Sequence, residues 1–355
     1  MQVNAILILE NLAPWAPMVG RLSLKKKELS CLAGIEVFGK PVASRIIEAL
    51  RDRADITVIH GAASPSPIKE RGVDTIIVQN HDGDREIAFV HAVQKLVKRN
   101  AGTTLIARLG AYVEFDLERA LQVHASRGQG ITPIHDKFGC LHYWLVDTNK
   151  LNKMTPSSFL SECEVELGLP FVTDGYVNRL EDAHDLRRLI VDSFLGRCAI
   201  RPRGREIRPG VWIDGSAHLH RSARVVAPVY IGNNTTVEST AVITRFTNLE
   251  NHCHIGAGSL VSDASVLPHT TIGNGLDISG AVVDGCEFVD LDRNVALTIG
   301  DPNLIAEAAS ARSHAPALRF YAEKSRQDRW RPEVEYSQYL TRAAGRFFEA
   351  FKGEA

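Results

Sequence analysis

The chain carries little net charge and few cysteines. Its 355 residues have a formal net charge of −1, which argues against an electrostatically driven nucleic-acid or membrane binder. The dense basic run at 25–27 is typical of a solvated loop. The six cysteines lie far apart without a Cys-x-x-Cys pair, which indicates neither a disulfide framework nor a zinc site. Such cysteine usage suits a reducing compartment.

The sequence also lacks long hydrophobic runs. No stretch approaches the roughly eighteen apolar residues of a membrane-spanning helix. Residues 1–10 show neither the basic start nor the cleavage-like site of a signal peptide. We therefore predict a cytoplasmic protein without a membrane partner. A P-loop, a Gly-x-Gly-x-x-Gly after a strand and a Ser–His–Asp spacing are likewise missing.

What the chain does contain is a six-residue repeat. Ten consecutive positions spaced by six are aliphatic: Ile213, Leu219, Val225, Ile231, Val237, Ile243, Leu249, Ile255, Val261 and Leu267. The residue two places before each of them is small or β-branched. Neither a helix, with a period of about 3.6, nor a strand, with a period of 2, produces this spacing. A triangular coil with one short strand per face does, so 211–290 is predicted to form a left-handed parallel β-helix.

Two details of the repeat carry expectations of their own. The frame slips at Gly273, because Ile272 and Ile278 continue it one residue early. Gly232 and Gly256 directly follow inward aliphatic residues, where we expect a sharp corner that favours positive φ.

Before the repeat, strand and helix patterns alternate. Apolar runs over 3–9, 56–59, 73–78, 103–109 and 141–146 predict strands, and helical patterns are found over 41–50, 85–98, 117–126 and 183–194. This alternation is typical of an α/β, Rossmann-like sheet with right-handed crossovers.

The length of the chain allows more than one domain. We predict an α/β domain over 1–196, a linker rich in proline and glycine over 197–210, the β-helix over 211–300 and a helical tail over 301–355. In the tail, Asp301-Pro302 suits the start of a helix over about 302–312. A second helix over 333–351 has an apolar stripe, which either packs back on the β-helix or forms an oligomer contact.

An α/β domain that leads into a hexapeptide-repeat β-helix resembles the sugar-1-phosphate nucleotidyltransferases, in particular the mannose-1-phosphate guanylyltransferase type. The resemblance covers about 1–290. It rests on five stretches that occur in the family's order: Ala5–Leu9, Phe38-Gly39-Lys40-Pro41-Val42, Leu109-Gly110-Ala111, Tyr176–Leu186 and Ile207–Val211. It implies a fold of this family for the first domain, which is shortened here.

The same resemblance implies catalytic groups that this chain lacks. The family has a glycine-rich loop after its first strand and two aspartates that hold Mg²⁺. Here 10–17 contains two prolines and no glycine, and the two aspartate positions are occupied by Ala111 and Arg179. The family's Glu-Lys-Pro sugar segment has no counterpart. The resemblance therefore predicts no metal site and a domain that has lost the standard reaction.

Four basic residues are candidates for binding a ligand: Lys27, Lys40, Arg108 and Arg179. By the resemblance, Lys27 lies near the family's phosphate-contacting lysine and Lys40 belongs to the Gly-Lys-Pro stretch, yet both could be ordinary loop lysines. Arg108 and Arg179 could converge and bind an anion without Mg²⁺. The alternative is a structural salt bridge to Asp116, Asp174 or Glu181.

The histidines of the repeat support a rival hypothesis. Acyltransferases with hexapeptide β-helices use a histidine as general base, and His252 and His254 flank a predicted turn. Such enzymes usually add a loop that encloses the acyl donor, and the ten-hexad run has no insertion. Outward histidines on a solvated face are the simpler interpretation.

The sequence thus predicts a nucleotidyltransferase-like protein of sugar-nucleotide or exopolysaccharide metabolism that acts as a ligand-binding, regulatory or assembly subunit. Its expected partners are further copies of itself, through the β-helix or the tail, or an active homologous nucleotidyltransferase. A sugar nucleotide is the expected ligand, and no cofactor is expected. The alternatives are an active, Mg²⁺-dependent nucleotidyltransferase with an atypical site, and an acyltransferase that uses His252 or His254.

Overall fold

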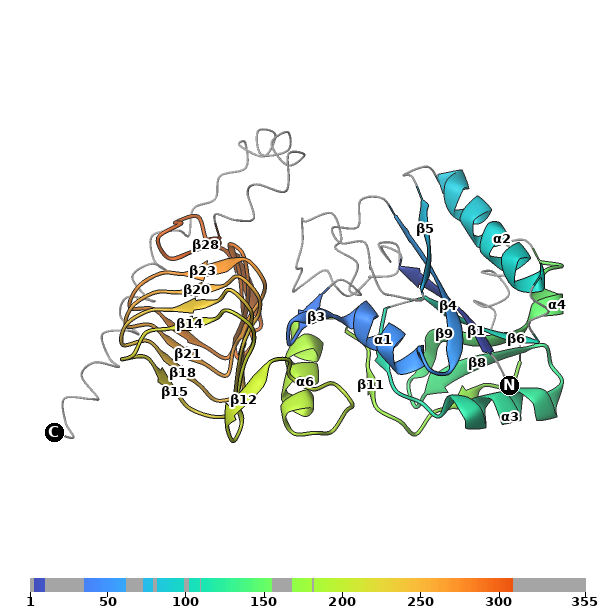
Figure 1. Ribbon diagram of the computed structural model, residues 1–355, viewed down its shortest axis with the longest axis horizontal. Coiled ribbons are helices and arrows are strands. Elements are labelled where there is room, and N and C mark those ends of the chain that lie inside the picture. The colour runs from blue at the N-terminus through green and yellow to red at the C-terminus, as the bar shows by residue number, and fades with distance from the viewer. Residues whose placement is uncertain are drawn as a thin grey trace. The chain divides into compact units, whose positions relative to one another are not determined.

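A computed structural model describes residues 3–9, 35–61, 73–78, 82–98, 102–108, 110–154, 168–180 and 182–308. These residues form two compact units (Figure 1). The α/β unit contains 3–9, 35 and the described residues from 40 to 180, and the β-helix unit contains 36–39 and 182–308. Lys27 and the predicted tail helix over 333–351 lie outside the described residues.

The α/β unit is built on a seven-stranded mixed sheet of order β10-β8-β9-β6-β1-β4-β5. Its strands are β1 (Val3–Leu9), β4 (Ala54–Gly61), β5 (Asp74–Val78), β6 (Thr103–Arg108), β8 (Ile131–Asp136), β9 (Gly139–Asp147) and β10 (Phe171–Val172). β1 is parallel to both β4 and β6, whereas β9 is antiparallel to β6 and β8. All seven residues of β1 are buried, as expected for a strand covered on both faces.

Helices α1 (Val42–Leu50), α2 (Asp82–Lys98), α3 (Leu117–Arg127) and α4 (Thr148–Leu151) interleave with these strands, which confirms the predicted α/β pattern. Asp116 caps α3 by accepting a hydrogen bond from the Arg119 amide, and Gly128 ends it in the left-handed region. A short antiparallel pair, β7 (Tyr112–Val113) and β11 (Val177–Asn178), completes the unit. No helix of the described residues is long and apolar enough to cross a membrane.

The second unit confirms the predicted β-helix. One face is formed by β13 (Val211–Ile213), β16 (Val229–Ile231), β19 (Thr247–Leu249), β22 (Ser265–Val266) and β25 (Ala281–Asp284). A second face contains β14 (His218–Leu219), β17 (Thr236–Val237), β20 (His254–Ile255) and β23 (Thr270–Ile272). The third face contains β15 (Arg224–Val225), β18 (Val242–Thr244), β21 (Leu260–Ser262) and β24 (Asp277–Ser279). Val211 is in register with Val229, so one coil takes three hexads. The inward aliphatic residues form one core.

The slip in the repeat occurs earlier than predicted. Leu249 pairs with Val266, one residue short of a full coil of three hexads. Val266 therefore takes the inward position that was assigned to Leu267, and the frame changes at the corner around Asp263 rather than at Gly273. The corner was missed because Val266 and Leu267 are both aliphatic, so the pattern alone could not distinguish them.

The role predicted for the corner glycines is wrong. Gly232 and Gly256 do not have positive φ. A Cβ on Gly232 would lie 2.6 Å from the carbonyl carbon of Glu250, so glycine is required by the close approach of the next coil. Nine of the left-handed residues stand in three columns, one at each corner of the coil: Asn234, His252 and His269; Thr240, Gly258 and Gly275; and Arg245, Asp263 and Gly280.

Antiparallel strands close the ends of the β-helix. β12 (Arg205–Arg208) pairs with β13 at one end, and β26 (Glu287–Asp290), β27 (Val295–Thr298) and β28 (Ile305–Glu307) lie at the other. The helix predicted over 302–312 is therefore wrong in its described part. Asp301 does hold a turn by accepting from the Asn303 amide. The chain then continues as β28, because Ile305 is buried in the β-helix core.

Candidate functional sites

The first candidate site lies in the α/β unit at the carboxyl end of β6. The chain runs from β1 to β4 on one side of β1, while β6 lies on the other side, so the strand order reverses between β1 and β6. Ligands of open α/β sheets bind at such a switch point, beside the carboxyl ends of the strands. Arg108 is the last residue of β6 and lies at this edge.

Arg179 follows β11 and is held by the hairpin that joins β8 to β9. Its Nη2 donates to Oδ1 of Asp136 at 2.6 Å and to the carbonyl oxygen of Gly139 at 3.3 Å. Its Nε donates to Oδ2 of the same carboxylate at 3.3 Å. Burial acts to raise the pKa of Asp136, but the Arg179 hydrogen bonds and the Phe138 and Gly139 amides lower it overall. The carboxylate is thus kept ionised beside the guanidinium.

The salt-bridge interpretation of Arg179 therefore applies, with a partner that the sequence did not indicate. Asp116 caps α3, and Asp174 is paired with Arg119 at 3.4 Å. Glu181 lies outside the described residues. Asp136 was missed because it is 43 positions away from Arg179, on a strand that the sequence pattern did not reveal.

His142 is a third member of this site. It has a φ of 59° at the irregular start of β9, where the register with β8 shifts. Its pKa is lowered, first by burial and then by the charges of Arg108 and Arg179. The two arginines predicted to converge are therefore both within electrostatic reach of one imidazole. Sequence reasoning assigned His142 only to a buried strand.

The remaining predicted positions of this unit, Ala111 and Lys40, make contacts within the unit. Ala111 is buried, and its carbonyl oxygen accepts a hydrogen bond from the Tyr143 hydroxyl at 3.3 Å. The Lys40 ammonium forms an ion pair with Glu48 of α1. Among the residues that the structure describes, no group of three or more His, Cys, Asp or Glu side chains is arranged to hold a metal ion.

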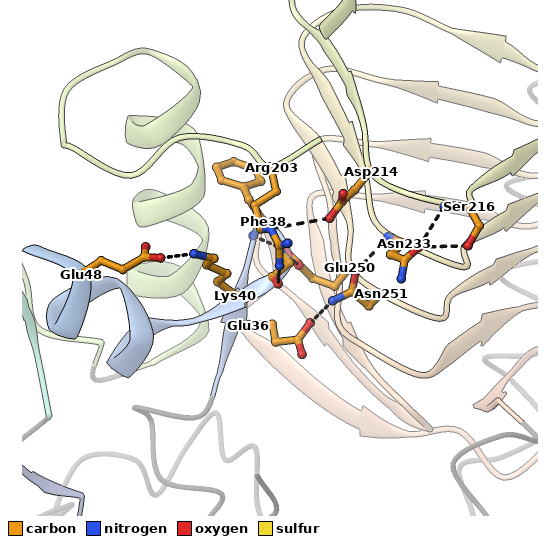
Figure 2. Close-up of polar contacts among 11 residues, drawn as sticks. Glu36, Phe38, Lys40, Glu48, Arg203, Asp214, Ser216, Asn233, Glu250 and Asn251 are labelled. Carbon is orange, nitrogen blue, oxygen red and sulfur yellow. Dashed lines mark hydrogen bonds and ion pairs between the residues drawn. The ribbon is translucent and has the colours of Figure 1, made fainter. Parts of the chain in front are cut away.

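The second candidate site lies in the β-helix unit and is centred on Glu250, directly after β19 (Figure 2). The turn Phe38–Gly39 joins β2 (Glu36–Val37) to β3 (Lys40–Pro41) and sits over this carboxyl group. Oε1 of Glu250 accepts from the Phe38 amide at 2.8 Å, and Oε2 accepts from the Gly39 amide at 2.7 Å. Both turn residues have positive φ, at 53° and 74°. A Cβ on Gly39 would lie 2.5 Å from the Tyr230 hydroxyl, so only glycine fits there.

Phe38 anchors the turn through an aromatic cluster. Its ring meets Phe194, at the end of α6 (Ala183–Phe194), and Tyr230 on β16, with ring centroids 4.7 and 5.2 Å apart in edge-to-face geometry. Trp212 and Phe246 pack against Phe194. The turn and α6 thereby cover the outward side of the face formed by β13, β16 and β19.

Polar groups surround the buried carboxyl. Asn248 donates to Oε1 of Glu250 at 2.9 Å, and Asn251 donates to Glu36 at 2.7 Å. Figure 2 shows that these contacts continue from coil to coil, since the Asn251 side chain accepts from the Asn233 amide and the Asn233 side chain accepts from the Ser216 amide. Nη1 of Arg203 donates a hydrogen bond to the Gly39 carbonyl oxygen at 3.1 Å. Its Nε lies 3.9 Å from Oδ2 of Asp214.

The two carboxyl groups of this site are difficult to ionise. Burial is the main cause that raises the pKa of Glu250 to about 7, and the charge of Glu36 adds to it against the opposing amide hydrogen bonds. Burial also raises the pKa of Glu36. The sequence contained no signal for the contact between the turn and Glu250, because Glu250 and Phe38 are 212 positions apart.

The histidines considered for acyl transfer lie at a corner and on a strand of the β-helix. His252 is a left-handed corner residue, and its ring stacks on His269 of the next coil at 4.7 Å with an interplanar angle of 5°. His254 is on β20, in register with Thr236 and Thr271. The fully described coils over 211–284 each take 17 or 18 residues, so none carries an inserted loop.

By its structure the chain belongs to the class of proteins that join a mixed α/β sheet unit to a β-helix. Comparison with known proteins adds no closer assignment, since no protein-family model and no curated protein matches the chain.

Proposed function

We propose that this chain is a nucleotidyltransferase-like protein of sugar-nucleotide or exopolysaccharide metabolism that has lost nucleotidyl transfer. It acts in the cytoplasm as a ligand-binding, regulatory or assembly subunit, with itself or an active homologous nucleotidyltransferase as partner. Its ligand is an anion of the sugar-nucleotide class, bound without Mg²⁺ near Arg108. Fold alone does not assign activity, so the proposal rests on the chemistry of the site.

The observation that carries the proposal is the cationic character of the site at the carboxyl end of β6. Transfer of a nucleotidyl group needs a divalent cation to offset the phosphate charge. Here the two positions that correspond to metal ligands in the resembling family are an apolar Ala111 and Arg179, whose guanidinium is held by Asp136. A cation at such a position repels Mg²⁺ and attracts phosphate directly.

The sheet topology supports the same proposal. A phosphate at the switch point between β1 and β6 would meet Arg108 at the strand end, with Arg179 and His142 nearby. Arg108 ends β6 at the switch point itself, so it is the residue from which we expect the larger share of ligand binding.

The test is a thermal-shift and calorimetry series with sugar nucleotides, in the presence of either Mg²⁺ or EDTA. A ligand that binds the native state raises the melting temperature, and we expect the same shift in both conditions. Arg108→Ala should weaken binding by roughly 10- to 100-fold, the value of one charge-assisted hydrogen bond. Lys153→Ala, an exposed residue of the same unit, is the matched control.

Two outcomes would contradict the proposal. Mg²⁺-dependent release of pyrophosphate from a nucleoside triphosphate and a sugar-1-phosphate would instead establish an active enzyme. Absence of any shift across the panel would remove the ligand-binding role.

A further inference from the structure

The carboxyl group of Glu250 is enclosed in a way that favours a bound proton. Glu250 is fully buried, and its hydrogen-bond donors are the Phe38 and Gly39 amides and the Asn248 side chain, all of them neutral. A buried carboxylate without a cation at hydrogen-bond distance is expensive, and such groups usually take up a proton instead.

The titratable and charged groups around Glu250 come from five separate places in the chain. Glu36 of β2 adds a second carboxyl, Tyr230 of β16 a phenol, and Cys253 a buried thiol whose pKa is raised by burial and by both glutamates. Asp214 after β13 adds negative charge near Tyr230. The positive charge of Arg203 reaches Glu36 and Tyr230, but Arg203 is shared with Asp214. The cluster is therefore richer in acids than in bases.

Two oxygen atoms of the described residues around Glu250 are buried without a hydrogen-bond partner. Among the described residues, the Tyr230 hydroxyl and Oδ1 of Asn248 are buried without a partner. Both residues are fully buried, and the Asn248 amide already contacts Glu250 through its nitrogen. An ionised carboxylate only accepts hydrogen bonds, whereas a protonated one can also donate to such an oxygen. A proton on Glu250 would therefore add a donor to a cluster that holds two unpartnered oxygens.

We propose that the turn Phe38–Gly39 is a proton-linked clasp on the β-helix, which closes with uptake of a proton by Glu250 and opens when that carboxyl ionises. Glu250 lies on the outward side of its coil, beneath the two turn amides. Movement of the turn away from Glu250 would expose the carboxyl group to water, and its pKa would return to the ordinary value. The clasp is independent of the anion site in the α/β unit and does not rest on the proposed function.

The direction of the pH dependence follows from the linkage of closing to proton binding. The closed state binds the proton more tightly, with a pKa of about 7 against an ordinary 4.5 for the exposed group. Closing is therefore favoured at low pH and weakens as the pH rises from about 4.5 to about 7. The equilibrium constant for opening should rise by on the order of 100-fold over this window, and should not change further above it.

Hydrogen exchange of the Phe38 and Gly39 amides in the full chain measures this opening directly. After correction for intrinsic exchange, we expect a larger equilibrium constant for opening at pH 8 than at pH 5 in the wild type. Glu250→Gln should abolish the difference, because its amide does not titrate. Glu238→Gln, a partly buried glutamate after β17, is the matched control and should behave like the wild type.

Glu36→Gln provides an independent variant if Glu250→Gln does not fold. It removes the neighbouring charge that raises the pKa of Glu250, so the midpoint of the opening curve should move to lower pH. Opening that does not vary with pH in the wild type would overturn the clasp. So would a pH dependence that persists unchanged in Glu250→Gln, or a midpoint that Glu36→Gln does not move.

Discussion

The two units of this protein treat their enclosed charges in opposite ways. In the α/β unit, the Arg179 guanidinium has a carboxylate and two carbonyl oxygens as acceptors, so its charge is matched where it lies. In the β-helix unit, the Glu250 carboxyl is bonded by neutral donors and lies near a second acid. The first arrangement fixes a cation in place. The second makes the enclosed charge depend on pH.

The difference shows which enclosed charges serve as structure and which respond to solution conditions. A paired charge keeps its state over the usual pH range. The hydrogen bonds and charge of Arg179, together with the Phe138 and Gly139 amides, lower the pKa of Asp136 by more than burial raises it. An unpaired carboxyl has its pKa moved toward neutrality, where small changes of pH alter its state. The same protein therefore holds a permanently ionised pair in one unit and a titrating group in the other.

The largest expected effect is on the pH dependence of stability. The native pKa of Glu250 is raised from 4.5 to about 7, so the native state binds more protons than the unfolded state in that window. Stability from this group is therefore greatest at low pH and falls as the pH rises, by about 3 kcal/mol in all. Urea unfolding of the full chain at pH 5 and pH 8 measures the change.

The informative quantity is the difference between the wild type and Glu250→Gln. His142 has a lowered pKa and acts in the opposite direction, because its contribution is present above the unfolded pKa of 6.5 and is lost as the pH falls. Both proteins share that term, so subtraction removes it. Parallel stability profiles for the two proteins would show that Glu250 carries no such linkage.

A smaller effect is expected where a buried cation of the β-helix unit loses its partner. Arg187 of α6 has a side chain that is 8% exposed and bonds Asp263 at 2.5 Å, along with the Phe246 carbonyl oxygen. Asp263→Asn keeps a residue that tolerates the left-handed corner but removes the charge. We expect a loss of about 2 kcal/mol in the free energy of unfolding.

Arg188→Ala, one residue along the same helix, is the control for this substitution. Arg188 forms an exposed pair with Asp185, which should contribute no more than about 0.5 kcal/mol. Equal losses in the two variants would mean that enclosure of Arg187 does not matter.

The smallest expected effect concerns the ion pair of Arg179 and Asp136 in the α/β unit. Asp136→Asn leaves the Arg179 hydrogen bonds largely possible but removes their compensating charge. We expect about 1 kcal/mol of destabilisation and a further lowering of the His142 pKa, because Arg179 would then act on the imidazole unopposed. An NMR titration of the histidines gives the pKa. A rise would contradict the assigned geometry.

The predicted architecture was accurate where the signal is local. Buried strands such as β1 read as continuous apolar runs, and the inward column from Ile213 to Val261 reads as a strict repeat of six. The errors lie where two residues satisfy the same pattern or where a local signal competes with packing. Val266 occupies the inward position that was predicted for Leu267. The capping pair at Asp301 is followed by a strand rather than a helix, because Ile305 is buried in the core.

The candidate sites were less predictable. Arg108 and Arg179 could be named from the sequence, but Asp136 and His142 could not. In the β-helix unit, the aromatic residues at the outward positions Trp212 and Tyr230, one coil apart, were an available signal that this face is covered. Nothing local indicated that the covering element is a turn near residue 38.

The sequence by itself determined that this chain forms a β-helix after an alternating α/β region. The periodicity is readable because every hexad has the same short-range steric requirements and the same pattern of burial. The tertiary structure alone decided that Asp136 would hold Arg179 and that Glu250 would be enclosed by the Phe38–Gly39 turn. Those contacts join residues 43 and more than 200 positions apart, and the pKa of each group depends on neighbours that no local pattern contains.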